Sequence, residues 1–83
     1  MSRPLKRSFS IKGHRTSISL EAAFWDALRD AAAEQKLTLA GLVAQIDDKR
    51  GDNGGLSTAV RIWVLDYFRR RAELNSYDGG SRD

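Results

Sequence analysis

Cysteine is absent from this chain of 83 residues, and histidine occurs once, as His14. Without cysteine no disulfide can form, and a lone histidine does not make an ordinary zinc site. A chain of this length buries only about 60% of the surface that its unfolded form exposes. We therefore expect it to be stabilised by a partner chain, because neither a covalent link nor a metal is at hand.

Long hydrophobic runs are also missing. No apolar stretch approaches the ~20 residues that span a bilayer, and the basic start MSRPLKR is not followed by the apolar core of a signal peptide. These absences predict a soluble, cytoplasmic protein without a membrane partner. No carboxylate pair stands in a recognisable acid–base setting, so we expect no enzymatic activity. We also expect no bound metal and no cofactor.

Positive charge is concentrated at the start of the chain. The first 15 residues hold five basic residues and no acidic one, so with a net charge of +3 the other 68 residues sum to −2. A basic segment of this kind suits an anionic polymer, although a tail that only aids solubility is the alternative. We predict a flexible basic arm over residues 1–12 and a disordered, polar tail over residues 75–83.

Residues 15–20 predict a short strand, because polar and apolar side chains alternate there. Ile18 and Leu20 would face the helices. Since the chain shows no second strand of similar quality, we expect this strand to pair antiparallel with its copy in a second chain, across a twofold axis. Phe9 and Ile11 fall in the opposite register, so a bend or bulge is expected at Gly13.

Three helices are predicted, over residues 21–35, 38–48 and 57–73, with Thr38 and Ser57 as candidate N-caps of the last two. The third is apolar on more than one side, which one small subunit could hardly cover. A second subunit would cover it. The expected dimer core comprises Ile18, Leu20, Phe24, Leu28, Val60, Trp63, Val64 and Tyr67.

The segment RTSISLEAAFWDALRDAAAEQKLTL, with its Arg-x-Ser-x-Ser polar face, resembles the ribbon-helix-helix family of DNA-binding proteins, which includes MetJ and Arc. Residues 11–72 resemble more closely a compact bacterial subgroup of that family. The resemblance implies a mainly α ribbon-helix-helix homodimer over residues 13–74, with an intermolecular two-stranded antiparallel ribbon and one extra short helix. In that family the ribbon enters the major groove of DNA.

The resemblance also implies roles for particular residues. Arg15, Ser17 and Ser19 take the base-reading positions, and the helix that starts at Ser57 and Thr58 holds a phosphate. A phosphate clamp at Thr38 is the alternative. Lys6, Arg7 and Lys12 would attract phosphates, and His14 either contacts a phosphate or has no role.

Together these residues predict sequence-specific binding of double-stranded DNA by a homodimer, which would be a bacterial transcriptional regulator in the cytoplasm, associated with the nucleoid. The alternative is a protein-interaction or dimerisation module, or an antitoxin-like protein, that keeps the fold without reading DNA. That alternative implies a protein partner. Serine at two of the three reading positions is a weak discriminator of bases, which keeps the alternative open.

Overall fold

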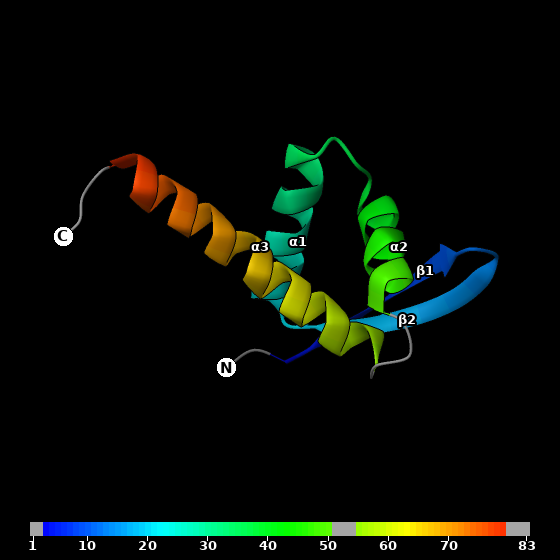
Figure 1. Cartoon of the computed structure of the whole chain (residues 1–83). Coiled ribbons are helices and arrows are strands. Elements are labelled where there is room, and N and C mark those ends of the chain that lie inside the picture. The colour runs from blue at the N-terminus through cyan, green and yellow to red at the C-terminus, as the bar shows by residue number, and fades with distance from the viewer. Residues whose placement is uncertain (1–2, 51–54, 80–83) are drawn as a thin grey trace.

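The computed structural model describes residues 3–50 and 55–79, with side chains as far as residue 74. Two antiparallel strands are followed by three helices (Figure 1). In chain order the elements are β1 (Leu5–Ile11), β2 (His14–Leu20), α1 (Ala22–Glu34), α2 (Leu39–Arg50) and α3 (Leu56–Gly79).

The two strands form a hairpin through a turn of two residues. Lys12 and Gly13 have φ angles of 52° and 79°, and positive φ at both central positions is the type I′ turn whose twist suits a tight hairpin. The register pairs Ile11 with His14, and Leu5 with Leu20. The bend expected at Gly13 is confirmed.

One expectation about the strands is wrong: residues 5–11 are strand β1 and not a flexible arm. Within the chain, β2 pairs with β1. Pairing of β2 with its copy in a second chain stays a prediction. The opposite register of Phe9 and Ile11 has a simple cause. A two-residue turn places odd-numbered residues of β1 opposite even-numbered residues of β2, and residues that face each other share one side of the sheet.

The helices begin and end with local bonds. Thr38 is confirmed as the N-cap of α2, because its Oγ1 accepts from the Gly41 amide at 2.9 Å. At the end of α1, Lys36 has a φ of 59° and the Leu37 amide donates to the carbonyl of Ala32 at 2.9 Å. This 6→1 bond, together with the left-handed residue Lys36, is the Schellman motif that ends α1. Beyond it the chain continues toward α2.

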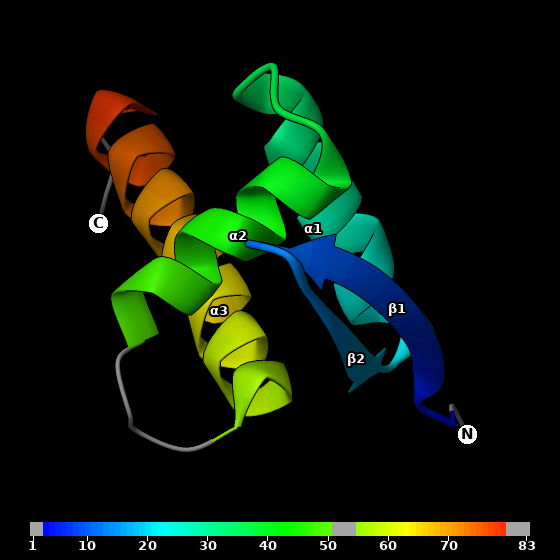
Figure 2. The ribbon, with the colours of Figure 1, turned by 90° about the vertical axis from the view of Figure 1, so that its right-hand side faces the viewer.

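All three helices contact the ribbon, and they leave its other face to solvent (Figure 2). The largest fully buried side chains come from every element except β1; burying each aliphatic one contributes about 1.5–3 kcal/mol. They are Ile18, Leu20, Trp25, Leu28, Leu42, Val43 and Val60.

The predicted dimer core is therefore largely the core of one chain. Ile18, Leu20, Leu28, Val60 and Val64 are buried within a single subunit. The remaining three members, Phe24, Trp63 and Tyr67, are partly buried around it.

Helix α3 is longer than predicted. It runs from Leu56 to Gly79 and projects beyond α1, away from the ribbon (Figure 1). Residues 75–79, expected to be disordered, continue it, because no helix breaker interrupts the chain before Gly79 and an existing helix extends readily. Residues 80–83 of the predicted tail lie outside the described residues.

Candidate nucleic-acid interface

The solvent-facing side of the ribbon carries only polar side chains. Cross-strand pairs on this side are Lys6 with Ser19, Ser8 with Ser17, and Ser10 with Arg15. We call these six residues the outer row. It holds two cations and no acid, and all its members but Ser19, which is half-buried, are exposed.

The middle of the outer row is joined across the strands. The hydroxyl oxygens of Ser8 and Ser17 lie 3.2 Å apart, within hydrogen-bond distance. Lys6 and Arg15 stand at opposite ends of the row and on opposite strands. The side chains at the centre of the row are short serines and those at its two ends are cations, so a polyanion can approach the ribbon closely.

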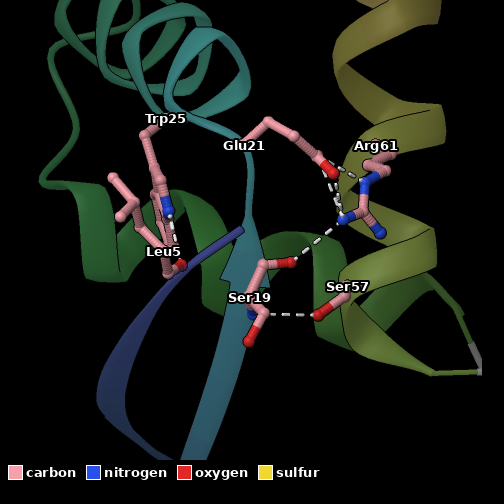
Figure 3. Close-up of polar contacts among 6 residues, drawn as sticks. All are labelled: Leu5, Ser19, Glu21, Trp25, Ser57 and Arg61. Carbon is pink, nitrogen blue, oxygen red and sulfur yellow. Dashed lines mark hydrogen bonds and ion pairs between the residues drawn. The ribbon is translucent and has the colours of Figure 1, made fainter. Parts of the chain in front are cut away.

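Ser19 is tied to α3 by a cluster that we call the junction cluster: Ser19, Glu21, Ser57 and Arg61 (Figure 3). The Ser19 amide donates to Oγ of Ser57 at 3.1 Å. The Arg61 guanidinium donates to the Ser19 carbonyl at 3.3 Å and to both carboxylate oxygens of Glu21, at 3.1 and 3.3 Å. The first turn of α3 is thus fixed beside the end of β2.

Charge pairing in this cluster shifts one pKa. The hydrogen bond from Arg61 lowers the pKa of Glu21 below its ordinary value of 4.5. Arg61 also lies over the ring of Phe24, 5.9 Å from its centroid. One arginine therefore joins the end of β2, the start of α1 and the first turns of α3.

Strand β1 is attached to α1 by Trp25. The indole Nε1 donates to the Leu5 carbonyl at 2.9 Å (Figure 3), and the ring packs against Phe9, with centroids 6.0 Å apart. Arg7, predicted to attract phosphate, instead lies over the Trp25 ring at 5.4 Å. It belongs to the helix-facing register of β1, so it does not join the outer row.

The other predicted phosphate contacts are scattered. Lys12 is in the hairpin turn and pairs with Asp48 of α2, which raises the pKa of Lys12 and lowers that of Asp48. His14 is exposed at the start of β2, opposite Ile11. Of the predicted phosphate-binding residues, only Lys6 lies in the outer row.

At the start of α3, Thr58 is exposed, but Ser57 does not cap the helix. The helix begins at Leu56, and the Ala59 amide donates to the Gly55 carbonyl at 3.1 Å. The Ser57 hydroxyl oxygen accepts from Ser19, across the gap between α3 and β2. This helix start lies next to the outer row, whereas the Thr38 hydroxyl is engaged within its own helix end.

Sequence reasoning missed Ser8 and Ser10 as members of the polar face. A signal for them was present: Leu5, Phe9 and Ile11 alternate with Lys6, Ser8 and Ser10 immediately before a two-residue turn. Arg7 interrupts this alternation, and Lys-Gly is a less common type I′ pair than Asn-Gly. Arg61, which bonds to Glu21 and Ser19, and Asp48, which pairs with Lys12, lie far from these partners in the chain. No local sequence pattern predicts such pairs.

Two other kinds of site are absent from the residues that the structure describes. No group of three or more histidine, aspartate or glutamate side chains gathers there as metal ligands would. None of the helices in the same part of the chain is long and apolar enough to cross a membrane.

Comparison with known proteins identifies the architecture. A ribbon-helix-helix domain model matches residues 4–68, which is most of the chain and all of the ribbon. The chain belongs to the ribbon-helix-helix family. Domains of this family are generally non-enzymatic and act in DNA binding and regulation.

A solved structure also resembles this ribbon-helix-helix chain. It is an uncharacterized protein from Bordetella pertussis Tohama I, with a TM-score of 0.75 and 29% identity. The match covers 86% of this chain and 60% of the Bordetella protein, so this chain spans less than two thirds of that relative. No curated protein matches the chain.

Proposed function

We propose that this ribbon-helix-helix protein binds double-stranded DNA sequence-specifically as a homodimer and regulates transcription in the bacterial cytoplasm, on the nucleoid. The observation that carries the proposal is the outer row. Its exposed face has two cations, four serines and no acid, and it is backed by a packed helical core. A ribbon of two strands fits the major groove.

The chemistry of the row suits base edges. Arg15 can donate two parallel hydrogen bonds to guanine, and the hydroxyl groups of Ser17 and Ser19 can donate or accept. The first turn of α3, with Thr58 exposed beside the ribbon, supplies backbone amides for a phosphate. Lys6 adds charge at the far end of the row.

The homodimer is supported by α3. Ile62 and Leu65 are 56% and 55% exposed, and with their neighbours they follow the four-three spacing of a coiled-coil stripe. The stripe comprises Ile62, Leu65, Arg69 and Ala72. Two antiparallel copies bring Ile62 of each against Leu65 of the other, so the stripe is complementary to itself.

DNA binding is tested by selection from a random DNA pool and by gel shift, with wild type and Arg15→Ala. Loss of one bidentate contact costs about 1–3 kcal/mol and relaxes preference at one position. Arg29→Ala, which removes an exposed cation on α1, is the control and should keep the wild-type preference. If Arg15→Ala enriches the same sequences with the same affinity as wild type, the row does not read bases.

The homodimer is tested by the mass of the protein in solution. Leu65→Glu should shift the protein to the monomer, whereas Ala33→Glu, at an exposed position of α1, should not. A wild-type monomer at micromolar concentration would contradict the dimer.

A second candidate is a protein-interaction module, and a groove between α2 and α3 favours it. The groove is about 270 Å³ and is lined by residues that include Ile46, Ala59, Ile62 and Trp63. Absence of DNA binding even at low salt would favour this candidate. A slope of log affinity against log salt of about −0.9 for each phosphate neutralised would favour DNA.

A further inference from the structure

We infer that β1 contacts the DNA backbone and not the bases, so that Lys6, Ser8 and Ser10 bind phosphates along the wall of the major groove while β2 meets the base edges. The group that β1 recognises is therefore the phosphodiester. This inference rests on the proposed function and on the predicted pairing of β2 with its copy in a second chain.

Strand β1 turns alternate side chains to the surface that would face DNA. The register pairs Lys6 with Ser19 and Ser8 with Ser17, and residues that face each other in an antiparallel pair lie on the same side of the sheet. Lys6, Ser8 and Ser10 are all exposed there. Any molecule that covers the outer row therefore meets β1 as well as β2.

The open edge of β2 is the edge at which a second copy would join. Because Ile11 and His14 flank a two-residue turn, the backbone N–H and C=O groups of Arg15 and Ser17 point away from β1. Pairing at this edge would place the two copies of β2 at the centre of a four-stranded sheet. In that arrangement β1 is the outer strand of each subunit.

Strand spacing then separates the roles of the two strands. Neighbouring strands lie about 4.8 Å apart, so the twofold axis would pass about 2.4 Å from β2 and about 7 Å from β1. The major groove is about 12 Å wide, which puts its walls roughly 6 Å from its middle. A central β2 therefore stands over the base edges, and an outer β1 stands over the sugar–phosphate wall.

The side chains of β1 suit phosphates. The strand, LKRSFSI, has no acidic residue, and lysine and serine are among the side chains that commonly bond to phosphate oxygens. Lys6 and Ser10 are four residues apart, which is about 14 Å along a strand. Phosphates of one DNA strand are spaced about 3.4 Å along the helix axis, so the outward side chains of β1 can meet more than one of them.

Strand β1 is a fixed part of the domain. The indole of Trp25 donates to the Leu5 carbonyl at 2.9 Å, which holds the first residue of β1 to α1, and Ile11 at its last residue is 5% exposed. Arg7 lies over the Trp25 ring, so the outward-facing cation of β1 is Lys6. With both ends held, β1 presents its polar side chains without first having to become ordered.

The first experiment measures affinity against salt concentration for wild type, Lys6→Ala and Lys6→Arg, on the DNA sequence that the wild-type protein enriches. Each phosphate neutralised contributes about −0.9 to the slope of log affinity against log salt, so loss of Lys6 from both subunits should make the slope less steep by about 1.8. The affinity advantage of wild type over Lys6→Ala should then be roughly tenfold larger at 50 mM than at 200 mM salt. Lys6→Arg should keep the wild-type slope, and so should the control Arg29→Ala, which removes an exposed cation of α1.

Selection from a random DNA pool separates phosphate contacts from base contacts. Lys6→Ala, Ser8→Ala and Ser10→Ala should enrich the same sequence as wild type, whereas Arg15→Ala should relax the preference at one position. Ser8→Ala and Ser10→Ala remove a hydroxyl group and no charge. Each should weaken binding by at least about twofold, as expected for one lost hydrogen bond, and leave the salt slope unchanged.

A change in the DNA gives a test that does not depend on how a variant folds. Uncharged methylphosphonates placed along the groove wall should weaken binding of wild type more than that of Lys6→Ala, and equal weakening would contradict a phosphate contact by Lys6. A changed base preference in Lys6→Ala or Ser10→Ala, or a wild-type salt slope in Lys6→Ala, would overturn the inference while the proposed function stands. If the wild-type protein bound no DNA, the proposed function itself would fail.

Discussion

Ser57→Ala should loosen the junction between β2 and α3. The substitution removes the oxygen that accepts from the Ser19 amide at 3.1 Å. A lost hydrogen bond that leaves a partly buried amide without an acceptor costs roughly 1–2 kcal/mol. In a domain of this size each kcal/mol lowers Tm by about 4–8 °C.

The assay is urea unfolding combined with amide hydrogen exchange. In Ser57→Ala the Ser19 amide should exchange faster, while Ser57→Thr, which keeps a hydroxyl group, should remain close to wild type. If Ser57 were instead the N-cap of α3, the amides of Ala59 and Val60 would be the ones to exchange faster. That outcome, or unchanged stability and unchanged exchange at Ser19, would refute the assigned bond.

Three further substitutions test the rest of the scaffold. Gly13→Ala should destabilise the hairpin by about 1–2 kcal/mol, because φ is +79° there and a residue with a Cβ is strained at that angle. The added Cβ meets no atom within 4 Å, so no steric clash adds to this cost. Gly55→Ala, where φ is not positive and space is also open, should be near neutral in urea unfolding. Trp25→Phe removes the donor to the Leu5 carbonyl, so we expect a loss of about 1–3 kcal/mol and faster exchange along β1, with equal exchange contradicting the anchor. The hydrogen bond from Arg61 holds the pKa of Glu21 below 4.5, so the stability that ionised Glu21 gives the fold is complete above pH 4.5 and is lost as pH falls through the lowered pKa. The Tm difference between wild type and Glu21→Gln should therefore shrink on acidification. A constant Tm difference from pH 7 to pH 3 would argue against the Glu21–Arg61 pair.

Local patterns predicted the parts of the fold that depend on local forces. The alternation of Thr16, Ile18 and Leu20 located β2 to within a residue, and the Thr38 cap and the helical spacing of Leu42, Val43 and Ile46 located α2. Ribbon-helix-helix membership, inferred from the Arg-x-Ser-x-Ser face and the helices, is confirmed.

The errors arose where distant residues decide the structure. Strand β1 was predicted to be a flexible arm because the segment is basic and Phe9 and Ile11 fall out of register with the apolar residues of β2. The pairing across the two-residue turn explains that register, and the ring of Trp25, 18 residues away in the chain, lies against Arg7. Ser57 was read as a helix cap because a serine before an apolar helix usually is one; its true partner, the Ser19 amide, is brought near only by the complete fold. The base-reading role of Arg15, Ser17 and Ser19 stays a prediction.

The outer row has a consequence for how such a protein can change over time. Its side chains contribute nothing to the buried core, and four of the six are serines, the smallest hydroxyl side chains. Substitutions there should alter what the ribbon contacts while the hydrophobic packing that keeps the chain folded is untouched. Duplicated copies of this chain could therefore acquire new target sequences one residue at a time, without passing through an unfolded intermediate.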